Sequence, residues 1–304
     1  MDQLRLGANK ATVNPGVDYR CFGPWTAPGN AAKLFQFLPE VNMEAVHHMI
    51  LYGGRGCGGK ILYAWARTGQ TSPMGLNYAE ETLEEGHGIL VDPSGARGGV
   101  SYFSLQIHYQ LEGTTPIRDS SGLRLWFSPE APKRPLQIVL NALSPSIPAR
   151  SVVDECVRCR VTRAGTVIGW RNHAHSLGRD IWSDHVSADG RAQPPLGLIS
   201  AEQPQIIRIL ASPRELAVGD WLQLHCIYNA STRSAHTYVG AGVDGEMCNQ
   251  YLVSSMDLRV QCYGINYANR SRTCEAQGQR LHPHDAKAWT AHSPRRQGYN
   301  TPMR

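Results

Sequence analysis

The 304-residue sequence predicts an all-β protein built from two antiparallel β-sandwich domains. Short segments in which apolar and polar residues alternate recur along most of the chain, and Gly, Pro, Asn and Ser separate them. No long stretch carries the 3.6-residue period of an amphipathic helix. Many short strands distributed over two halves favour sandwiches, which bury inward side chains between two sheets and leave the outer faces available.

Residues 101–111 show the clearest alternation. The odd-numbered positions from Phe103 to Leu111 are apolar, whereas Gln106 and His108 belong to the polar, even-numbered positions. Because successive side chains of a strand point to opposite faces, one face is expected to pack and the other to be free for chemistry. Further strands are expected over residues 44–52, 60–67, 136–143, 160–175, 205–211, 221–229 and 247–256.

A proline-rich stretch divides the chain. Residues 128–135 contain three prolines, which oppose regular pairing and favour an extended spacer. The sequence therefore predicts an N-terminal domain over residues 1–130, a C-terminal domain over residues 131–280 and a flexible tail over residues 281–304. The net charge of +5 arises in residues 270–304, which lack strand patterning, so a nucleic-acid partner is not expected.

The composition favours secretion. Eight cysteines, an even number, suit disulfides in an oxidising compartment, and Asn229-Ala230-Ser231 and Asn269-Arg270-Ser271 are N-glycosylation sequons, as in a glycoprotein. No apolar run approaches the roughly 18 residues of a membrane-spanning helix, and the first ten residues lack the apolar core of a secretory signal. The expectation is a secreted or secretory-pathway protein without a membrane span, whose signal peptide is absent from this sequence.

A polar row in the second half is the sharpest local signal. If residues 166–175 form a strand, Arg171, His173 and His175 share one face. Two imidazoles beside a guanidinium indicate a metal site next to a cationic group. An exposed strand that happens to carry two histidines would give the same pattern, so other segments must decide.

The first half supplies three more histidines. His47 and His48 are adjacent and would point to opposite faces of a regular strand, so one metal can bind both only if the backbone bends or the rings use different nitrogens. His108 would complete a three-imidazole site that suits copper or catalytic zinc. Separate strand histidines without a metal are the alternative.

Residues 244–251 are the expected partner of the second-half histidines. On a strand, Met247, Asn249 and Tyr251 share one face. A methionine in a strand is usually a packing residue. Beside two histidines, however, a thioether would complete a soft, open site that suits copper better than magnesium or calcium.

The same parity turns Cys248 inward. Cys226 belongs to the inward row of residues 221–229, so a Cys226–Cys248 disulfide would join two strands through the core. Cys156 and Cys159 form a lone C-x-x-C pair, a redox or zinc element in other proteins, but no second pair completes a four-thiolate site.

Together these segments resemble the catalytic core of the peptidylglycine α-hydroxylating monooxygenases, a copper type II, ascorbate-dependent family. The matching segments run in family order between Cys21 and Cys274; they are His47-His48-Met49, residues 61–67, residues 105–109, residues 171–178 and residues 246–251. Five matches in order are far more specific than a histidine pair.

The resemblance implies two jelly-roll-like sandwich domains that face each other across a cleft, each with one of two copper ions. The electron-transfer copper would be held by His47, His48 and His108. The oxygen-binding copper would be held by His173, His175 and Met247, which with His108 form the implied catalytic set. Ascorbate would supply the electrons and O2 would be the co-substrate.

The resemblance also assigns substrate-binding residues. The family uses an arginine, an asparagine and a tyrosine at the positions of Arg171, Asn249 and Tyr251, whose donors could hold a C-terminal carboxylate. Gln106 matches a family glutamine near the cleft and is expected to position water or substrate.

Other positions bear on the pocket and the disulfides. Ser176 and Val253 replace a histidine and a methionine of familiar members, so the resemblance does not fix the lining of the substrate pocket. Cys21–Cys57 and Cys226–Cys248 match family disulfides. The pairing of the remaining cysteines is open; these are Cys156, Cys159, Cys262 and Cys274. One disulfide is expected between the strand that carries Cys156 and Cys159 and the C-terminal segment.

The expected function is that of a peptidylglycine monooxygenase, which hydroxylates the α-carbon of the C-terminal glycine in glycine-extended peptides, the first step of peptide C-terminal amidation. The chain lacks room for the lyase of bifunctional members, so a separate lyase is the expected partner. One alternative is a dopamine or tyramine β-monooxygenase-like amine hydroxylase. Another is a non-catalytic copper-binding protein.

Overall fold

A computed structural model describes residues 2–66, 81–82, 86–96, 98–201, 203, 205, 207–240 and 244–263 of the chain. These residues form strands and no helix, which confirms the predicted all-β class. Within them, no helical segment is long and apolar enough to cross a membrane. The predicted tail over residues 281–304, Cys274 and the Asn269 sequon lie outside the described residues.

The strands divide between two halves of the chain. The N-terminal half, residues 2–128, contains β1 (Asp2–Gly7), β2 (Ala11–Val13), β3 (Gly16–Thr26), β4 (Lys33–Glu40), β5 (Val46–Gly53), β6 (Lys60–Ala66), β7 (Glu81–Thr82), β8 (His87–Leu90), β9 (Tyr102–Leu111), β10 (Ile117–Asp119) and β11 (Gly122–Ser128). The C-terminal half, residues 134–263, contains β12 (Arg134–Leu143), β13 (Ser146–Ile147), β14 (Val152–Arg163), β15 (Gly165–His173), β16 (Gly178–Val186), β17 (Ala192–Ser200), β18 (Arg208–Leu216), β19 (Trp221–Asn229), β20 (Thr237–Tyr238), β21 (Cys248–Ser255) and β22 (Arg259–Tyr263).

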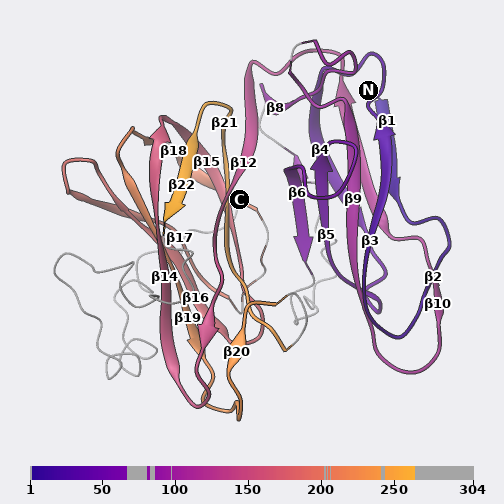
Figure 1. The fold of residues 1–304 in the computed structure, drawn as a ribbon. Helices are drawn as coiled ribbons and strands as arrows, with labels where there is room; N and C mark the ends of the chain where they lie inside the picture. Colours follow the sequence, from indigo (N-terminus) through magenta and orange to yellow (C-terminus); the bar gives the residue numbers. More distant parts are fainter. Residues whose placement is uncertain are drawn as a thin grey trace.

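Each half is a sandwich of two sheets around its own core (Figure 1). In the N-terminal half, the sheet β3-β9-β5-β6 packs against β1-β11-β4-β8, and both contribute to one apolar cluster. In the C-terminal half, β12-β21-β15-β18 packs against β17-β16-β19-β14-β22 around a second cluster. The predicted sandwich architecture is therefore confirmed.

Strand β12 joins the two sandwiches. Its first residues, Arg134 and Pro135, pair in parallel with β8, and the residues from Leu136 onward pair with β21, so one nine-stranded sheet runs through both halves. The expectation that the prolines prevent pairing is wrong for Pro135, because proline is tolerated at the start of a strand. Residues 129–133 carry no strand, and the domain boundary at residue 130 stays a prediction.

Strand β9 confirms the alternation predicted for residues 101–111. Its odd-numbered apolar side chains are at most 3% exposed and belong to the N-terminal core. The polar face is covered as well, contrary to expectation: Ser104 and His108 are 0% exposed, and the ring of Tyr19 stacks on His108. Chemistry on this face therefore takes place in a buried setting.

Three predicted strands differ clearly from the structure: those over residues 160–175, 247–256 and 205–211, the last of which is β18 at Arg208–Leu216. The run 160–175 is two strands, because the chain crosses from one sheet of the sandwich to the other at Ala164, and β15 ends at His173. Strand β21 begins at Cys248, one residue after Met247. His175 and Met247 therefore lie just outside the regular strands, and strand parity does not place them.

Three disulfides join described residues: Cys21–Cys57, Cys159–Cys262 and Cys226–Cys248. The two expected pairs are confirmed, and Cys159–Cys262 is the expected link from the C-x-x-C strand. Cys156 is also disulfide-bonded, and the other described cysteines are not its partner. Cross-links of this kind typically stabilise a fold by about 2–4 kcal/mol.

Asp220 fastens the turn that precedes β19. This residue is 4% exposed, and its carboxylate accepts hydrogen bonds from the backbone N–H groups of Ala217 at 2.9 Å and Ala188 at 3.0 Å, and contacts His185 Nε2 at 2.9 Å. Burial alone would raise the pKa of Asp220, but the three donors outweigh it and hold the pKa below its usual value.

Replacing Asp220 by Asn is expected to lower the free energy of unfolding at pH 7 by about 1–3 kcal/mol, because one acceptor oxygen becomes a donor among buried donors. A carboxyl group with a lowered pKa stabilises the fold above its unfolded-state pKa near 3.9, and that contribution is lost as the pH falls through the folded-state pKa. Urea unfolding should therefore show the difference between wild type and variant shrinking below about pH 4. A difference in the free energy of unfolding that is as large at pH 3 as at pH 7 would contradict this account. Asp189→Asn, at an exposed aspartate, is the control.

Candidate metal centres

Three histidines of the N-terminal half converge on one point. His48 on β5 lies directly opposite His108 on β9, and the register shifts between Val46 and His48, so His47 is an extra residue relative to β9. Such a β-bulge bends the strand and lets adjacent side chains turn to the same side. This is the backbone bend that the sequence left open as one of two possibilities.

The geometry of these rings fits a metal ion. Their Nδ1 atoms form a triangle with sides of 3.2, 3.2 and 3.3 Å. Nitrogens bound about 2.0 Å from a tetrahedral ion lie about 3.3 Å apart, so the triangle matches one face of such a site. Burial lowers the pKa of His48 well below its usual value and that of His108 to about 4, so both rings are neutral and offer lone pairs to a cation.

Tyr19 on β3 is a member of this cluster that sequence reasoning missed. Its ring stacks on His108 with the centroids 4.0 Å apart and lies edge-on to His48 at 6.0 Å. Burial raises the pKa of its hydroxyl to about 12, although the residue is 42% exposed. Tyr19 lies directly opposite His108 in the pairing of β3 with β9. Its place in the cluster could be predicted only by someone who already knew that these two strands pair.

The second histidine pair lies at the end of β15. His173 is the last residue of the strand and His175 follows in a turn, yet their ring centroids are 5.1 Å apart. Nδ1 of His173 contacts Gln205 Oε1 at 2.5 Å, and Nδ1 of His175 contacts the Gly245 carbonyl at 3.0 Å. These contacts leave Nε2 of each ring for a metal, and Nε2 of His175 is buried without a hydrogen-bond partner.

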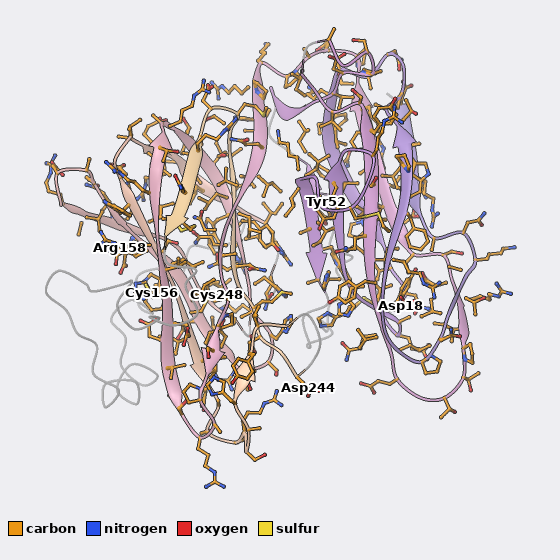
Figure 2. The ribbon with its side chains drawn as sticks, viewed as in Figure 1. Asp18, Tyr52, Cys156, Arg158, Asp244 and Cys248 are labelled. Atoms are coloured by element: carbon orange, nitrogen blue, oxygen red, sulfur yellow. A yellow bond between two sulfur atoms is a disulfide. The ribbon has the colours of Figure 1, made fainter. Side chains whose placement is uncertain are left out.

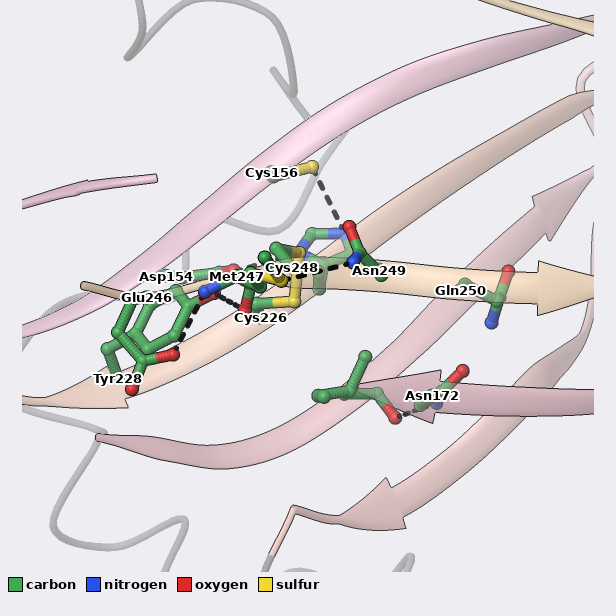
Figure 3. The surroundings of a disulfide bond; sticks show 12 residues. Asp154, Cys156, Asn172, Cys226, Tyr228, Glu246, Met247, Cys248, Asn249 and Gln250 are labelled. Carbon is green, nitrogen blue, oxygen red and sulfur yellow. Dashed lines mark hydrogen bonds and ion pairs between the residues drawn. A yellow bond between two sulfur atoms is a disulfide. The ribbon is translucent and has the colours of Figure 1, made fainter. Parts of the chain in front are cut away.

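Met247 lies beside the Cys226–Cys248 disulfide (Figure 3). Its Sδ atom contacts Nδ2 of Asn249 at 3.6 Å, and the Tyr228 hydroxyl donates a hydrogen bond to its carbonyl at 2.7 Å. Cys248 is 0% exposed and packs in the C-terminal core, as predicted. The disulfide therefore anchors the point from which Met247 projects.

Glu246 ties the His175 turn to the Met247 segment. This residue is 0% exposed, and its carboxylate accepts backbone hydrogen bonds from His175 at 2.8 Å, Leu177 at 2.6 Å and Met247 at 3.1 Å. Burial raises the pKa of Glu246, and these donors only partly oppose the shift. Sequence reasoning included Glu246 in a matching segment but missed this role, which depends on contacts between residues about 70 positions apart.

The two histidine sets lie against each other in this structure. The rings of His47 and His175 are 5.6 Å apart, although they belong to different halves. Burial, followed by the charge of Tyr251 in the C-terminal half, raises the pKa of Tyr52 on β5. Figure 2 shows Tyr52 on the side of its sandwich that faces the C-terminal half.

Arg171 is a buried cation that contacts no carboxylate of the described residues. It is 3% exposed, its Nε donates a hydrogen bond to the Gln205 carbonyl at 2.7 Å, and its guanidinium lies 5.0 Å from the ring centroid of Tyr251. Tyr251 is directly opposite Arg171, and Asn249 is directly opposite His173. Since an unpaired buried charge is costly, this arrangement favours an anionic ligand.

Gln106 is a predicted substrate-binding residue, but among the described residues the structure shows no hydrogen bond between it and the histidines of either set. It shares the face of His108 on β9, and lies opposite Ile50. Its proposed role in positioning water or substrate stays a prediction.

Gln205 links the second histidine pair to Arg171 and was missed as a site residue. Besides accepting from Arg171 and contacting His173, its Nε2 donates hydrogen bonds to the carbonyls of Ala174 at 2.9 Å and Ala201 at 3.2 Å. The side chain is thereby fixed with its oxygen toward His173. A glutamine about thirty residues from its partner carries no pattern that would have identified it.

Gln205→Ala is expected to weaken metal binding at the second histidine pair by about 10–100-fold, because the acceptor that fixes the His173 ring is lost. Binding at the three-histidine cluster should be unchanged. Competition titrations of copper against a chelator would measure both sites. Gln205→Glu keeps the acceptor and is the matched control; equal losses in both variants would show that the hydrogen bond is not responsible.

Comparison with known proteins finds a family that matches the C-terminal half of the chain. Residues 144–269 match the family described as "Copper type II ascorbate-dependent monooxygenase, C-terminal domain". The match contains the second histidine pair, Met247 and Arg171. The resemblance drawn from the sequence motifs is therefore confirmed.

Curated relatives extend the similarity into the N-terminal half. Peptidyl-glycine alpha-amidating monooxygenase B of Xenopus laevis is 29% identical over 74% of this chain and 27% of its own length, and the mouse enzyme is 28% identical over 79% of this chain and 25% of its own length. Rat dopamine beta-hydroxylase is 27% identical over 53% of this chain and 28% of its own length. The chain thus spans about a quarter of the length of these relatives.

Proposed function

Because residues 144–269 match the C-terminal domain of the copper type II ascorbate-dependent monooxygenases, we propose that this chain hydroxylates the α-carbon of a C-terminal glycine in peptides. The observation that carries the proposal is Arg171, a 3% exposed guanidinium next to the second histidine pair that makes no ion pair with a described carboxylate. A peptide carboxylate is the counter-ion that such a site lacks.

The residues around Arg171 support a carboxylate ligand. Tyr251 and Asn249 occupy the strand that pairs with β15, and both offer neutral hydrogen-bond donors. Charge-assisted hydrogen bonds from a guanidinium, joined by neutral donors, hold carboxylates in a defined orientation. Anchoring the carboxylate at Arg171 would bring the adjoining glycine α-carbon toward His173 and Met247.

An amine substrate finds less support in this arrangement. A phenethylamine would present an ammonium group, which needs a carboxylate or an aromatic face. Glu246 is a carboxylate in this region, but it already accepts three backbone N–H groups. Arg171 would in addition repel a cation.

The donor sets fit two copper ions. His47, His48 and His108 form an all-imidazole set, whereas His173, His175 and Met247 combine two imidazoles with a thioether, which favours Cu(I). Copper in these sites would pass electrons from ascorbate and activate dioxygen. The contact between His47 and His175 supports a short electron path between the sets, with ring centroids 5.6 Å apart.

The proposed reaction places one oxygen atom of O2 in the glycine C–H bond. The second oxygen atom leaves as water, which takes up two protons and the two electrons of ascorbate. The product is an α-hydroxyglycine peptide, which a separate lyase would cleave to the amide. The disulfides of the described residues favour a secretory compartment for this chemistry.

Mass spectrometry tests the proposal directly. The protein is incubated with copper, ascorbate, oxygen and a glycine-extended peptide, and the peptide is expected to gain one oxygen atom at its C-terminal glycine. The amidated form of the same peptide should be inert. Preferential hydroxylation of tyramine would support the amine hydroxylase, and copper binding without any turnover would support a copper-binding protein.

A further inference from the structure

A cavity lies where the two halves meet, away from the histidine clusters. Its volume is about 260 Å³, and its wall includes Gly53, Gly54, Lys60, Gly98 and Tyr102 of the N-terminal half and Met256 of the C-terminal half. Gly53 lies five residues beyond His48 on β5, about 16 Å along an extended strand. The cavity is therefore separate from the proposed metal and substrate sites.

Lys60 brings to this cavity a positive charge that makes no ion pair with a carboxylate of the described residues. The recorded contact of its Nζ atom is Met256 Sδ at 3.3 Å, and a thioether is only a weak acceptor. Burial, followed by the positive charge of Arg259, lowers the pKa of Lys60. The carboxylate of Asp92, next to the cavity-lining Gly99, accepts hydrogen bonds from the backbone N–H and the hydroxyl of Ser94.

Two further cations contact residues that line the cavity, and neither contacts a described carboxylate. Arg259, on the C-terminal half, donates hydrogen bonds to the carbonyls of Met256 and Leu258 at 2.8 Å and to Gln137 Oε1 at 3.3 Å. Arg55 lies 3.7 Å from the ring centroid of Tyr102 and contacts the Tyr102 hydroxyl. Arg55 and Arg259 are exposed, so solvent screens their charges, whereas Lys60 is half-buried and would gain most from a bound anion.

Glycines keep the wall of the cavity open. A Cβ atom added at Gly54 or Gly98 would meet no other atom within 4 Å, and both residues have a positive φ, of 144° and 73°, that favours glycine. The backbone is therefore accessible to a bound group at these positions. The side chains of Leu90, Val100 and Met256 form the apolar part of the wall, so the polar contacts of a ligand would come from Lys60, Ser101, Tyr102 and the glycine backbone.

We propose that this cavity binds a small oxyanion, a carboxylate or phosphate group, held by Lys60 with Arg259 and Arg55 at its edges. The bound anion would bridge Lys60 of the N-terminal half and Arg259 of the C-terminal half, and so stabilise the contact between the sandwiches. The site does not depend on the proposed hydroxylation.

Thermal unfolding and calorimetry of the full chain test the proposal, with inorganic phosphate and succinate as separate probes and sodium chloride at matched ionic strength as the reference. At least one probe is expected to raise Tm above the chloride reference and to bind at a site with one equivalent per chain that is lost in Lys60→Gln. Lys60→Gln should weaken this binding at least about tenfold and should not lower Tm in chloride, since it removes an unpaired charge. Lys60→Arg keeps the charge and should retain binding.

Two controls separate this cavity from other cationic sites. Lys10→Gln removes an exposed lysine outside the cavity wall and should leave binding unchanged. Arg171→Gln removes the proposed substrate anchor, and the binding that Lys60→Gln abolishes should persist in it, so the result does not depend on the monooxygenase assignment. The order of affinity for phosphate and succinate identifies the kind of oxyanion. The proposal is overturned if neither probe acts beyond chloride, or if Lys60→Gln binds them as well as the wild type.

Discussion

Replacing Met247 by Ile is expected to abolish the copper–sulfur scattering of the reduced, copper-loaded protein and to lower peptide hydroxylation by at least about a hundredfold. Isoleucine is similar to methionine in volume, so the packing change should cost less than about 1.5 kcal/mol. The backbone at this position is held independently of the side chain, by Tyr228 at the carbonyl and by Glu246 at the N–H. The loss should therefore reflect the thioether and not a displaced segment.

X-ray absorption spectroscopy measures the sulfur ligand without reference to turnover. Met49→Ile is the matched control, because Met49 is 0% exposed in the N-terminal core and its loss should leave the copper spectrum unchanged. The three-histidine cluster should keep its copper in both variants. Sulfur scattering that survives in Met247→Ile would remove Met247 from the ligand set.

Strand alternation predicted the parts of the site that lie within regular strands. Arg171 and His173 share a face of β15, and their cross-strand neighbours are Tyr251 and Asn249. The inward position of Cys248 likewise followed from the two-residue period of β21. These inferences need only the knowledge that side chains alternate along a strand.

Features that depend on irregular backbone or on pairing between distant strands could not be predicted from the sequence. The bulge at His47 brings adjacent histidines together, and nothing in the local sequence distinguishes it from a regular strand. His175 is placed by a turn that Glu246 holds from about seventy residues away. Gln205 and Tyr19 reach the histidines through tertiary contacts, which carry no periodic signal.

Arg171→Gln is expected to lower kcat/KM for a glycine-extended peptide by about 10–150-fold, the equivalent of one charge-assisted contact of about 1.5–3 kcal/mol. The change should appear mainly in KM, with a smaller loss of kcat if the carboxylate also positions the α-carbon. Arg171 contacts neither histidine ring through a recorded hydrogen bond, since its Nε bonds to the Gln205 backbone carbonyl. Copper occupancy should therefore stay at the wild-type level.

The stability of the variant distinguishes a binding role from a structural one. A guanidinium that is 3% exposed and has no carboxylate partner among the described residues costs free energy in the ligand-free fold, so removing its charge should leave the free energy of unfolding equal or higher. A structural arginine would show the reverse, with Tm and activity falling together. Affinity for the amidated peptide, which has no carboxylate, should be the same in wild type and variant, because the interaction that Arg171 supplies is absent in both. If the variant discriminates between the glycine-extended and amidated peptides as strongly as the wild type does, the carboxylate is not bound by Arg171, and the case for a peptide substrate loses its main support.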